Sequence, residues 1–174
     1  MKRHDALQPL SREHFNGLVL ARRLREAAGG DAEAGRRALR ELDAAWRNEL
    51  EGHFEDEERL LAGLVPADME RRLHDEHAAI RTLAMRLLRS SPAASEELTR
   101  FASMLQKHIR WEERELFPAA EDAATEEQLA FIAEHTQRVE RDRPGARKHK
   151  SGVAPFRPWD PGSSDELSDA GGRP

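Results

Sequence analysis

The chain has 174 residues, of which 38% are hydrophobic and 35% are charged, and its formal net charge is -5. This length suits one domain with a sizeable core. Acidic and basic residues are interleaved along the same segments without a sustained basic stripe, so we expect no nucleic-acid partner. The chain contains no cysteine, which excludes disulfides and any metal site with thiolate ligands.

The sequence gives no sign of a membrane protein. The first ten residues contain no long apolar run, and no later run is long enough to span a bilayer. We therefore expect a soluble, cytoplasmic protein that has no membrane partner.

Apolar residues recur at helical spacing in four long segments, each bounded by Gly, Pro or Ser. The spacing predicts helices over about 11–28, 32–64, 67–89 and 93–119, with Ser11 as the N-cap of the first. Alternating patterns typical of strands are missing. Because short turns make successive helices antiparallel, the predicted fold is all-α, an up-down-up-down four-helix bundle.

A shorter amphipathic segment, about 125–141, predicts a short fifth helix that packs across the bundle or at its end. The remaining chain is rich in Pro, Gly and Ser and has no apolar periodicity, so we expect residues 143–174 to form a disordered tail. The bundle and the fifth helix together would occupy 1–142. Because this tail contains Phe156 and Trp159, a docking segment for a protein partner is an alternative to a plain solubilising tail.

Each of the four long helices places a histidine on its apolar stripe, and two of them add a glutamate one turn later. A lone histidine on such a stripe is usually an ordinary core residue, but packing alone does not explain the same exception in four helices. Two buried carboxylates with no basic side chain between them cost on the order of several kcal/mol unless a cation neutralises them. The pattern therefore predicts a metal site with these ligands: His14, His53, Glu57, His77, His108 and Glu112.

The antiparallel order puts three of these histidines at one level of the bundle. His53 lies about eleven residues before the predicted end of its helix, His77 about ten after the start and His108 about ten before the end, so each lies roughly 15 Å from the same end. His14 lies nearer to its predicted helix start. Either the first helix begins deeper, or the preceding arm runs along that end of the bundle.

The ligand types limit the metal. Imidazoles and carboxylates admit iron, manganese or zinc and exclude soft-metal sites. Two glutamates able to bridge, with two histidines for each metal, are the composition of a dinuclear site on a four-helix scaffold. We expect two non-haem iron ions whose remaining positions take water or a small ligand such as oxygen, nitric oxide or peroxide.

These motifs resemble the hemerythrin-like family of HHE cation-binding domains over about residues 7–118. The matching pieces are His14 in LSREHFNGL, the H-x-x-x-E of HFEDEERLL, His77 in HDEHAAI and the H-x-x-x-E of HIRWEERELFP. The resemblance implies a non-haem di-iron centre in which Glu57 and Glu112 bridge the two irons.

The chain departs from the oxygen-carrying members of that family at two points. Leu73 stands where they have a fifth histidine, and the last helix carries H-x-x-x-E in place of H-x-x-x-x-D. The chain is therefore more similar to the bacterial hemerythrin-like proteins of mixed role. His74 is an alternative additional ligand, although it lies about 60° around the helix from His77 and a surface role is the simpler interpretation.

Other polar residues have simpler interpretations. Three glutamates are candidates for hydrogen bonds to the outward nitrogens of the histidines, with a solvated charge as the simpler alternative for each: Glu58, Glu76 and Glu115. We expect the remaining histidines to be exposed: His4, His135 and His149.

Three functions fit this pattern. The main expectation is a binding module that takes up iron and a small ligand for sensing or storage. A di-iron enzyme that consumes peroxide or oxidises a small substrate is the first alternative, although no second catalytic group accompanies the site. A metal-free helical interaction bundle is the second alternative, and the cost of unpaired buried carboxylates disfavours it.

Overall fold

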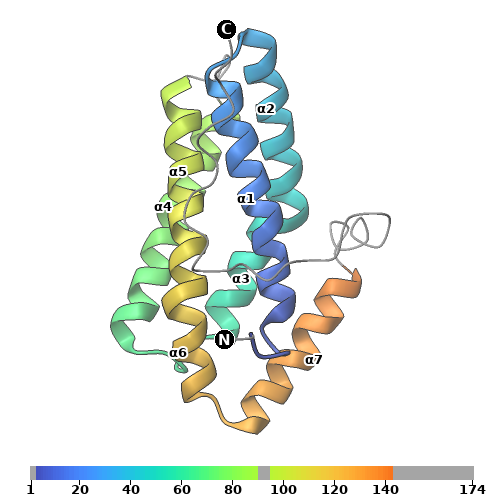
Figure 1. Ribbon diagram of the computed structural model, residues 1–174, viewed down its shortest axis with the longest axis vertical. Helices are drawn as coiled ribbons and strands as arrows, with labels where there is room; N and C mark the ends of the chain where they lie inside the picture. Colours follow the sequence, from blue (N-terminus) through green and yellow to red (C-terminus); the bar gives the residue numbers. More distant parts are fainter. Residues whose placement is uncertain (1–2, 90–94, 143–174) are drawn as a thin grey trace, which may run out of the picture.

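The computed structural model describes residues 3–89 and 95–142, and all regular structure in these residues is helical, as predicted (Figure 1). The predicted tail, with Phe156 and Trp159, lies outside the described residues. In chain order the structure contains α1 (Gln8–Ala28), α2 (Ala32–Ala45), the π-helical turn η1 (Trp46–Leu50), α3 (Glu51–Leu60), α4 (Ala67–Arg89), α5 (Ser95–Trp111), the π-helical turn η2 (Glu112–Leu116), α6 (Phe117–Ala123) and α7 (Glu126–Asp142).

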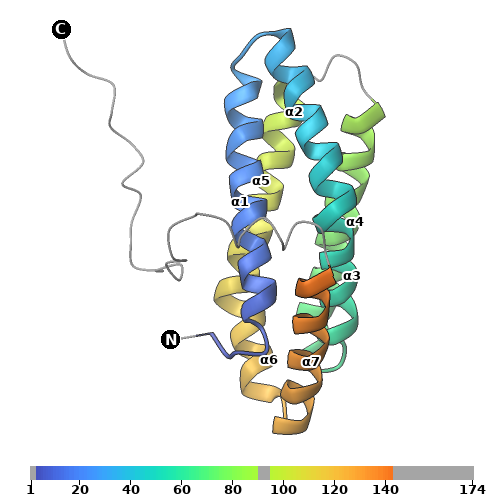
Figure 2. The same ribbon diagram turned by 90° about the vertical axis from the view of Figure 1, so that its right-hand side faces the viewer.

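These elements form four rods and one additional helix. The segment α2–η1–α3 is one continuous rod and α5–η2–α6 is another, and with α1 and α4 they run alternately up and down the molecule (Figures 1 and 2). The rod α1 packs along α5 and α2, and α4 packs along α5, α2 and α3. The antiparallel bundle predicted from the sequence is therefore confirmed.

The first helix begins earlier in the chain than the sequence predicted. It starts at Gln8, with Pro9 in its first turn, so the prediction of Ser11 as N-cap was wrong. Proline suits this position because the N–H it lacks would have no partner within the helix. Just before it, the N–H groups of Leu7 and Gln8 both donate to the His4 carbonyl. This earlier start brings His14 to the level of the other histidines.

Two rods contain a π-helical turn close to the polar residues of the core. The Glu51 N–H donates to the Trp46 carbonyl in η1, and the Phe117 N–H donates to the Glu112 carbonyl in η2. Such wide turns occur mostly as single insertions in α-helices, frequently at functional sites. Beyond η2 the helix continues past Pro118 to Ala123, because Pro118 occupies the first turn of α6.

The buried apolar residues form two clusters, one toward each end of the bundle. We call the cluster at the end of the bundle where α1 leads into α2 the upper cluster, and it includes Leu24, Leu42 and Phe101. The cluster at the opposite end, where α3 leads into α4, is the lower cluster, and it includes Leu61 and Leu116. Between them every rod contributes a histidine in place of an apolar residue. The polar residues predicted from the sequence therefore lie in a layer between two dry cores.

The last helix, α7, covers the lower end of the bundle beside α1 and α3 (Figure 2). Ile132 packs into the lower cluster, and the Thr136 hydroxyl donates to the Ala6 carbonyl at 3.1 Å. Arg12 on α1 donates from its guanidinium to both carboxylate oxygens of Glu140. This position agrees with the predicted fifth helix at the end of the bundle. Within the described residues, no helix is both long enough and apolar enough to span a membrane.

Candidate metal centre

Six polar side chains from four rods meet in the centre of the bundle, and none is more than 3% exposed. They are the six residues predicted from the sequence, and we call them the polar layer: His14, His53, Glu57, His77, His108 and Glu112. Two overlapping groups within this layer have ligand atoms close enough to hold a cation. One contains His14, His53 and Glu57, and the other contains the remaining three residues together with Glu57.

The carboxylate of Glu57 divides its oxygens between two pairs of histidines. Its Oε1 lies 3.1 Å from His53 Nε2 and 3.3 Å from His14 Nε2. Its Oε2 lies 3.5 Å from His77 Nε2. One oxygen therefore faces the His14–His53 side and the other faces the His77–His108 side.

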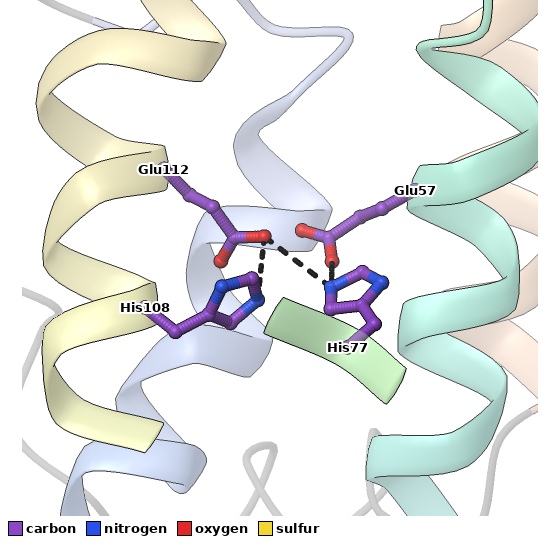
Figure 3. Close-up of side chains that lie close together, drawn as sticks. All are labelled: Glu57, His77, His108 and Glu112. Atoms are coloured by element: carbon purple, nitrogen blue, oxygen red, sulfur yellow. Dashed lines mark ion pairs between the residues drawn. The ribbon is translucent and has the colours of Figure 1, made fainter. Parts of the chain in front are cut away.

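Glu112 divides its oxygens in the same way from the opposite rod. Its Oε1 lies 2.9 Å from His108 Nε2 and 3.6 Å from His77 Nε2. Figure 3 marks both ion pairs with dashed lines. Its Oε2 lies 3.2 Å from His14 Nε2. The two carboxylates thus stand side by side across the middle of the polar layer, each with one oxygen toward each pair of histidines.

The inner atoms of the polar layer are close together but not hydrogen-bonded. Among the described residues, the Nε2 atoms of the four histidines and all four carboxylate oxygens are buried without a hydrogen-bond partner. Around a cation with bonds of about 2.1 Å and angles near 90°, neighbouring ligand atoms are about 3 Å apart. The separations of 2.9 to 3.6 Å match that spacing. The residues present therefore fit metal ions.

The outward nitrogen of each histidine pairs with a further carboxylate. The Nδ1 distances are 2.6 Å from His14 to Glu113, 2.8 Å from His53 to Glu13, 2.8 Å from His77 to Glu58 and 2.8 Å from His108 to Glu76. A carboxylate at Nδ1 accepts the proton there and leaves the Nε2 lone pair free to bind a metal. All four imidazoles are therefore oriented for metal binding from outside the polar layer.

The sequence identified two of these outer carboxylates and missed two. Glu58 and Glu76 were candidates, whereas Glu115 is exposed on η2 and its neighbour Glu113 takes the predicted role. Glu13 was also missed. Each of these two missed residues directly adjoins a predicted ligand in the chain, which is the only signal the sequence offers.

Arginines hold three of the outer carboxylates in place. Ion pairs join Arg3 to Glu113 at 2.9 Å, Arg81 to Glu58 at 2.7 Å and Arg72 to Glu76 at 2.7 Å. Burial would raise the pKa of the Glu58 carboxyl, but the contacts with His77 and then Arg81 outweigh it and lower this pKa to about 2. These carboxylates are therefore ionised at neutral pH and accept the histidine protons.

The charges of the polar layer depend on one another. Burial favours neutral imidazoles, but the facing glutamates outweigh it and raise the pKa of His53 to about 9 and that of His77 to about 10. Burial also favours neutral carboxyls, yet the histidines hold the pKa values of Glu57 and Glu112 below the usual range. Without a cation, the buried carboxylates therefore need protonated imidazoles beside them. A metal ion bound between the carboxylates would supply positive charge at the same place.

Aromatic rings shield the histidines from water. Phe54 stacks on His77 with ring centroids 4.0 Å apart, and Phe117 stacks on His14 at 5.2 Å. Trp111, which is 4% exposed, lies beside His108. These rings help to keep water from the histidines, which strengthens electrostatic interactions among them.

The other histidines lie outside the polar layer. His74 is half exposed, with its Nδ1 3.9 Å from Glu58, and Leu73 is buried in the lower cluster at the position of the missing fifth histidine. The expectation that His135 is exposed was wrong. Its side chain is 12% exposed, and its Nε2 lies 2.8 Å from Asp56 Oδ1, because α7 packs this face against α3. His4 is exposed as expected, and His149 lies outside the described residues.

Comparison with known proteins gives one family. The family model described as the hemerythrin HHE cation binding domain matches residues 5–120 and, in a second overlapping match, residues 68–155. No curated protein and no solved structure matches the chain significantly.

Proposed function

Because the chain belongs to the hemerythrin HHE cation-binding domain family, we propose that its polar layer binds two metal ions. The observation that carries this proposal is the division of oxygens in Glu57 and Glu112. One ion would take the nitrogens of His14 and His53, and the other those of the second histidine pair. Each glutamate would offer one oxygen to each ion, so Glu57 and Glu112 would help to hold both.

Charge balance supports two cations rather than none. The four imidazoles are surrounded by six carboxylates, two in the polar layer and four at the outward nitrogens. With neutral imidazoles the two inner carboxylates alone would place two negative charges in a dry interior, at a cost of several kcal/mol for each ion by order of magnitude. A metal-free interaction bundle would have to bear that cost or protonate its histidines.

We propose iron as the metal. Imidazole and carboxylate ligands suit iron, manganese and zinc, and two nitrogens with two bridging carboxylates leave each metal with fewer than six ligands. When bound, a pair of iron ions would supply redox chemistry toward small ligands such as oxygen, nitric oxide or peroxide. The protein's own part is to orient the imidazoles, exclude water and keep both carboxylates ionised.

We propose that the chain uses this centre to bind or sense a small ligand, or to store iron. The described residues contain no tyrosine or cysteine and offer no second group positioned for catalysis at the polar layer. The proposed domain occupies residues 1–142, with 143–174 as a tail, and the cytoplasm is the proposed location.

The test is elemental analysis of protein purified with iron available, followed by optical spectra before and after oxygen, nitric oxide and peroxide are added. Two irons per chain and a stable spectral change support a binding or sensing role. Catalytic turnover of peroxide by the same protein would instead identify an enzyme. A folded protein that binds no metal at all would contradict the proposal.

A further inference from the structure

The residues just before α1, 3–7, form an arm at the lower end of the bundle, beside α6 and α7 (Figure 1). Ala6 and Leu7 are fully buried in the lower cluster and anchor the arm. Arg3 lies beyond this anchor, with 16% of its side chain exposed. Substitution of Arg3 therefore leaves the buried residues of the arm unchanged.

Arg3 makes two contacts that lead to the same histidine of the polar layer. Its Nη2 donates to the Glu113 carbonyl at 2.7 Å and to Glu113 Oε2 at 2.9 Å. The other carboxylate oxygen, Oε1, faces His14 Nδ1 at 2.6 Å. The guanidinium also lies over the ring of Phe117, with Cζ 5.2 Å from the centroid, and this ring stacks on His14. Arg3 thus contacts both the carboxylate that holds this imidazole and the ring that covers it.

The same arrangement occurs at His77. Arg81 donates from Nη1 to Glu58 Oε1 at 2.7 Å, and this oxygen faces His77 Nδ1 at 2.8 Å. The Cζ atom of Arg81 lies 5.6 Å from the ring centroid of Phe54, which stacks on His77. Here too, one arginine contacts both the carboxylate and the ring that hold an imidazole.

His108 has a third such arginine. Arg72 donates from Nε to Glu76 Oε1 at 2.7 Å, and the other oxygen of Glu76 faces His108 Nδ1 at 2.8 Å. The Cζ atom of Arg72 lies 4.1 Å from the ring centroid of Trp111, which lies beside His108. The combination recurs at three imidazoles with arginines from two separate parts of the chain, which indicates a common role.

These contacts need the shape of a guanidinium. Its edge donates hydrogen bonds to a carboxylate while its flat face lies on an aromatic ring, and the compact ammonium of lysine does not do both. The three arginines differ in what carries them. Arg72 and Arg81 belong to α4, a helix of the bundle, whereas Arg3 belongs to the arm.

We propose that Arg3 is a positioning residue that fixes the imidazole of His14 through Glu113 and Phe117, so that the arm sets how firmly the His14 side of the polar layer holds its ion. Arg72 and Arg81 position the second histidine pair from within the bundle. The hold on the His14 side can therefore change without a movement of the four rods. The effect on the ion rests on the function proposed above, whereas the positioning of His14 does not.

Exchange of the His14 Nδ1 proton with water, measured by NMR on the full zinc-loaded chain, follows the positioning directly. In R3A this proton should exchange about tenfold faster, since a hydrogen bond to a charged group loses its support. The Nδ1 protons of His77 and His108 should keep their native rates. An unchanged rate at His14, or an equal increase at all three histidines, would overturn the proposal.

The matched control is R71A. Arg71 is an exposed arginine that directly precedes Arg72 on α4, so its loss should change none of the three exchange rates. If R3A does not fold, the same measurement on R3K decides. Lysine keeps a positive charge near Glu113 but not the flat face on Phe117, so R3K should show a smaller increase at His14. A native rate in R3K would overturn the need for a guanidinium.

Retention of the ion is measured by the transfer of zinc from the loaded protein to excess EDTA. In R3A one of the two ions should leave about tenfold faster, because loss of an outer support of a ligand commonly weakens metal binding by that factor or more. The other ion should leave at the native rate. Native rates for both ions would overturn the role of the arm in holding metal.

The double variant R3A/E113Q tests whether Arg3 acts through Glu113. If it does, the combined increase in zinc release should be smaller than the product of the two single increases. A full product would overturn this connection. The proposed function fails separately: a native chain that takes up no zinc would contradict it, whereas the exchange of the Nδ1 protons is measured in that chain in the same way.

Discussion

Glu112 on η2 turns one carboxylate oxygen toward His14 on α1, with Oε2 3.2 Å from His14 Nε2. Its other oxygen, Oε1, lies 2.9 Å from His108 Nε2. One side chain therefore serves both halves of the polar layer, whereas each histidine belongs chiefly to one half. This difference between carboxylates and imidazoles leads to different expectations for their substitution.

Replacing either inner glutamate should remove both metal ions. In E57A or E112A each ion loses one oxygen ligand and the remaining carboxylate cannot balance the charge, so the metal content should fall from about two ions per chain to near zero. In H53A only the ion beside His14 loses a ligand, and about one ion should remain. Elemental analysis of the purified variants measures the difference.

The control for this series is H74A. His74 is half exposed and its nearest carboxylate atom, on Glu58, lies 3.9 Å away, so H74A should keep both ions. Loss of one ion from H74A would make His74 a ligand. Loss of only one ion from E57A would contradict the bridging role of Glu57.

Glu113 and Glu115, neighbours on the same π-helical turn, give a matched pair. E113Q removes the charge that Nδ1 of His14 meets at 2.6 Å, and it should weaken metal binding on the His14 side by about 10- to 100-fold. E115Q makes the same chemical change at an exposed position and should have no effect. Metal titration by calorimetry should show one weakened site in E113Q. Equal affinities in the two variants would exclude a positioning role for Glu113.

The six residues of the polar layer were predictable because each breaks an apolar stripe. His53 and Glu57, for example, interrupt a run of leucines, and a helix of known period fixes which face they share. The outer carboxylates were harder to predict. Glu113 reaches His14 on another rod, and the rotation of one rod against its neighbour is set by packing that a single helix does not encode.

The spacing of the buried residues around η2 differs from that of a regular α-helix. Buried residues follow one another by steps of four at His108, Glu112, Leu116 and Ala120. Each step of four residues carries an α-helix about 40° beyond a full turn, so three such steps would turn the stripe away from the core. A wider turn at η2 corrects this drift.

Stability should depend on the concentration of free metal. Ions that bind only the folded chain stabilise it by about 2.7 kcal/mol for each site when the free metal is at a hundred times the dissociation constant. The inner carboxylate oxygens of the polar layer, which have no hydrogen-bond partner, are the groups expected to bind these ions. Thermal unfolding across a zinc series should show a rising Tm. In E57A the Tm should not respond to zinc. A native Tm independent of zinc would contradict metal binding by the folded state.

Substitution of His135 should loosen the last helix, α7, without changing the metal content. H135A removes the contact between His135 Nε2 and Asp56 Oδ1 and should lower the free energy of unfolding by about 1 kcal/mol, since Asp56 keeps its hydrogen bond from Arg59 at 2.8 Å. Backbone amides of α7 should exchange hydrogen faster, because this contact fastens α7 to α3.

Metal content should be the same in H135A as in the native chain, although Asp56 directly precedes Glu57. The control is E134A on the adjacent exposed position of α7, which should change neither exchange nor stability. If H135A lost metal while E134A kept it, His135 would belong with the ligands or their supports. If α7 amides exchanged at the native rate in H135A, the apolar contacts of Ile132 would be enough to hold the helix.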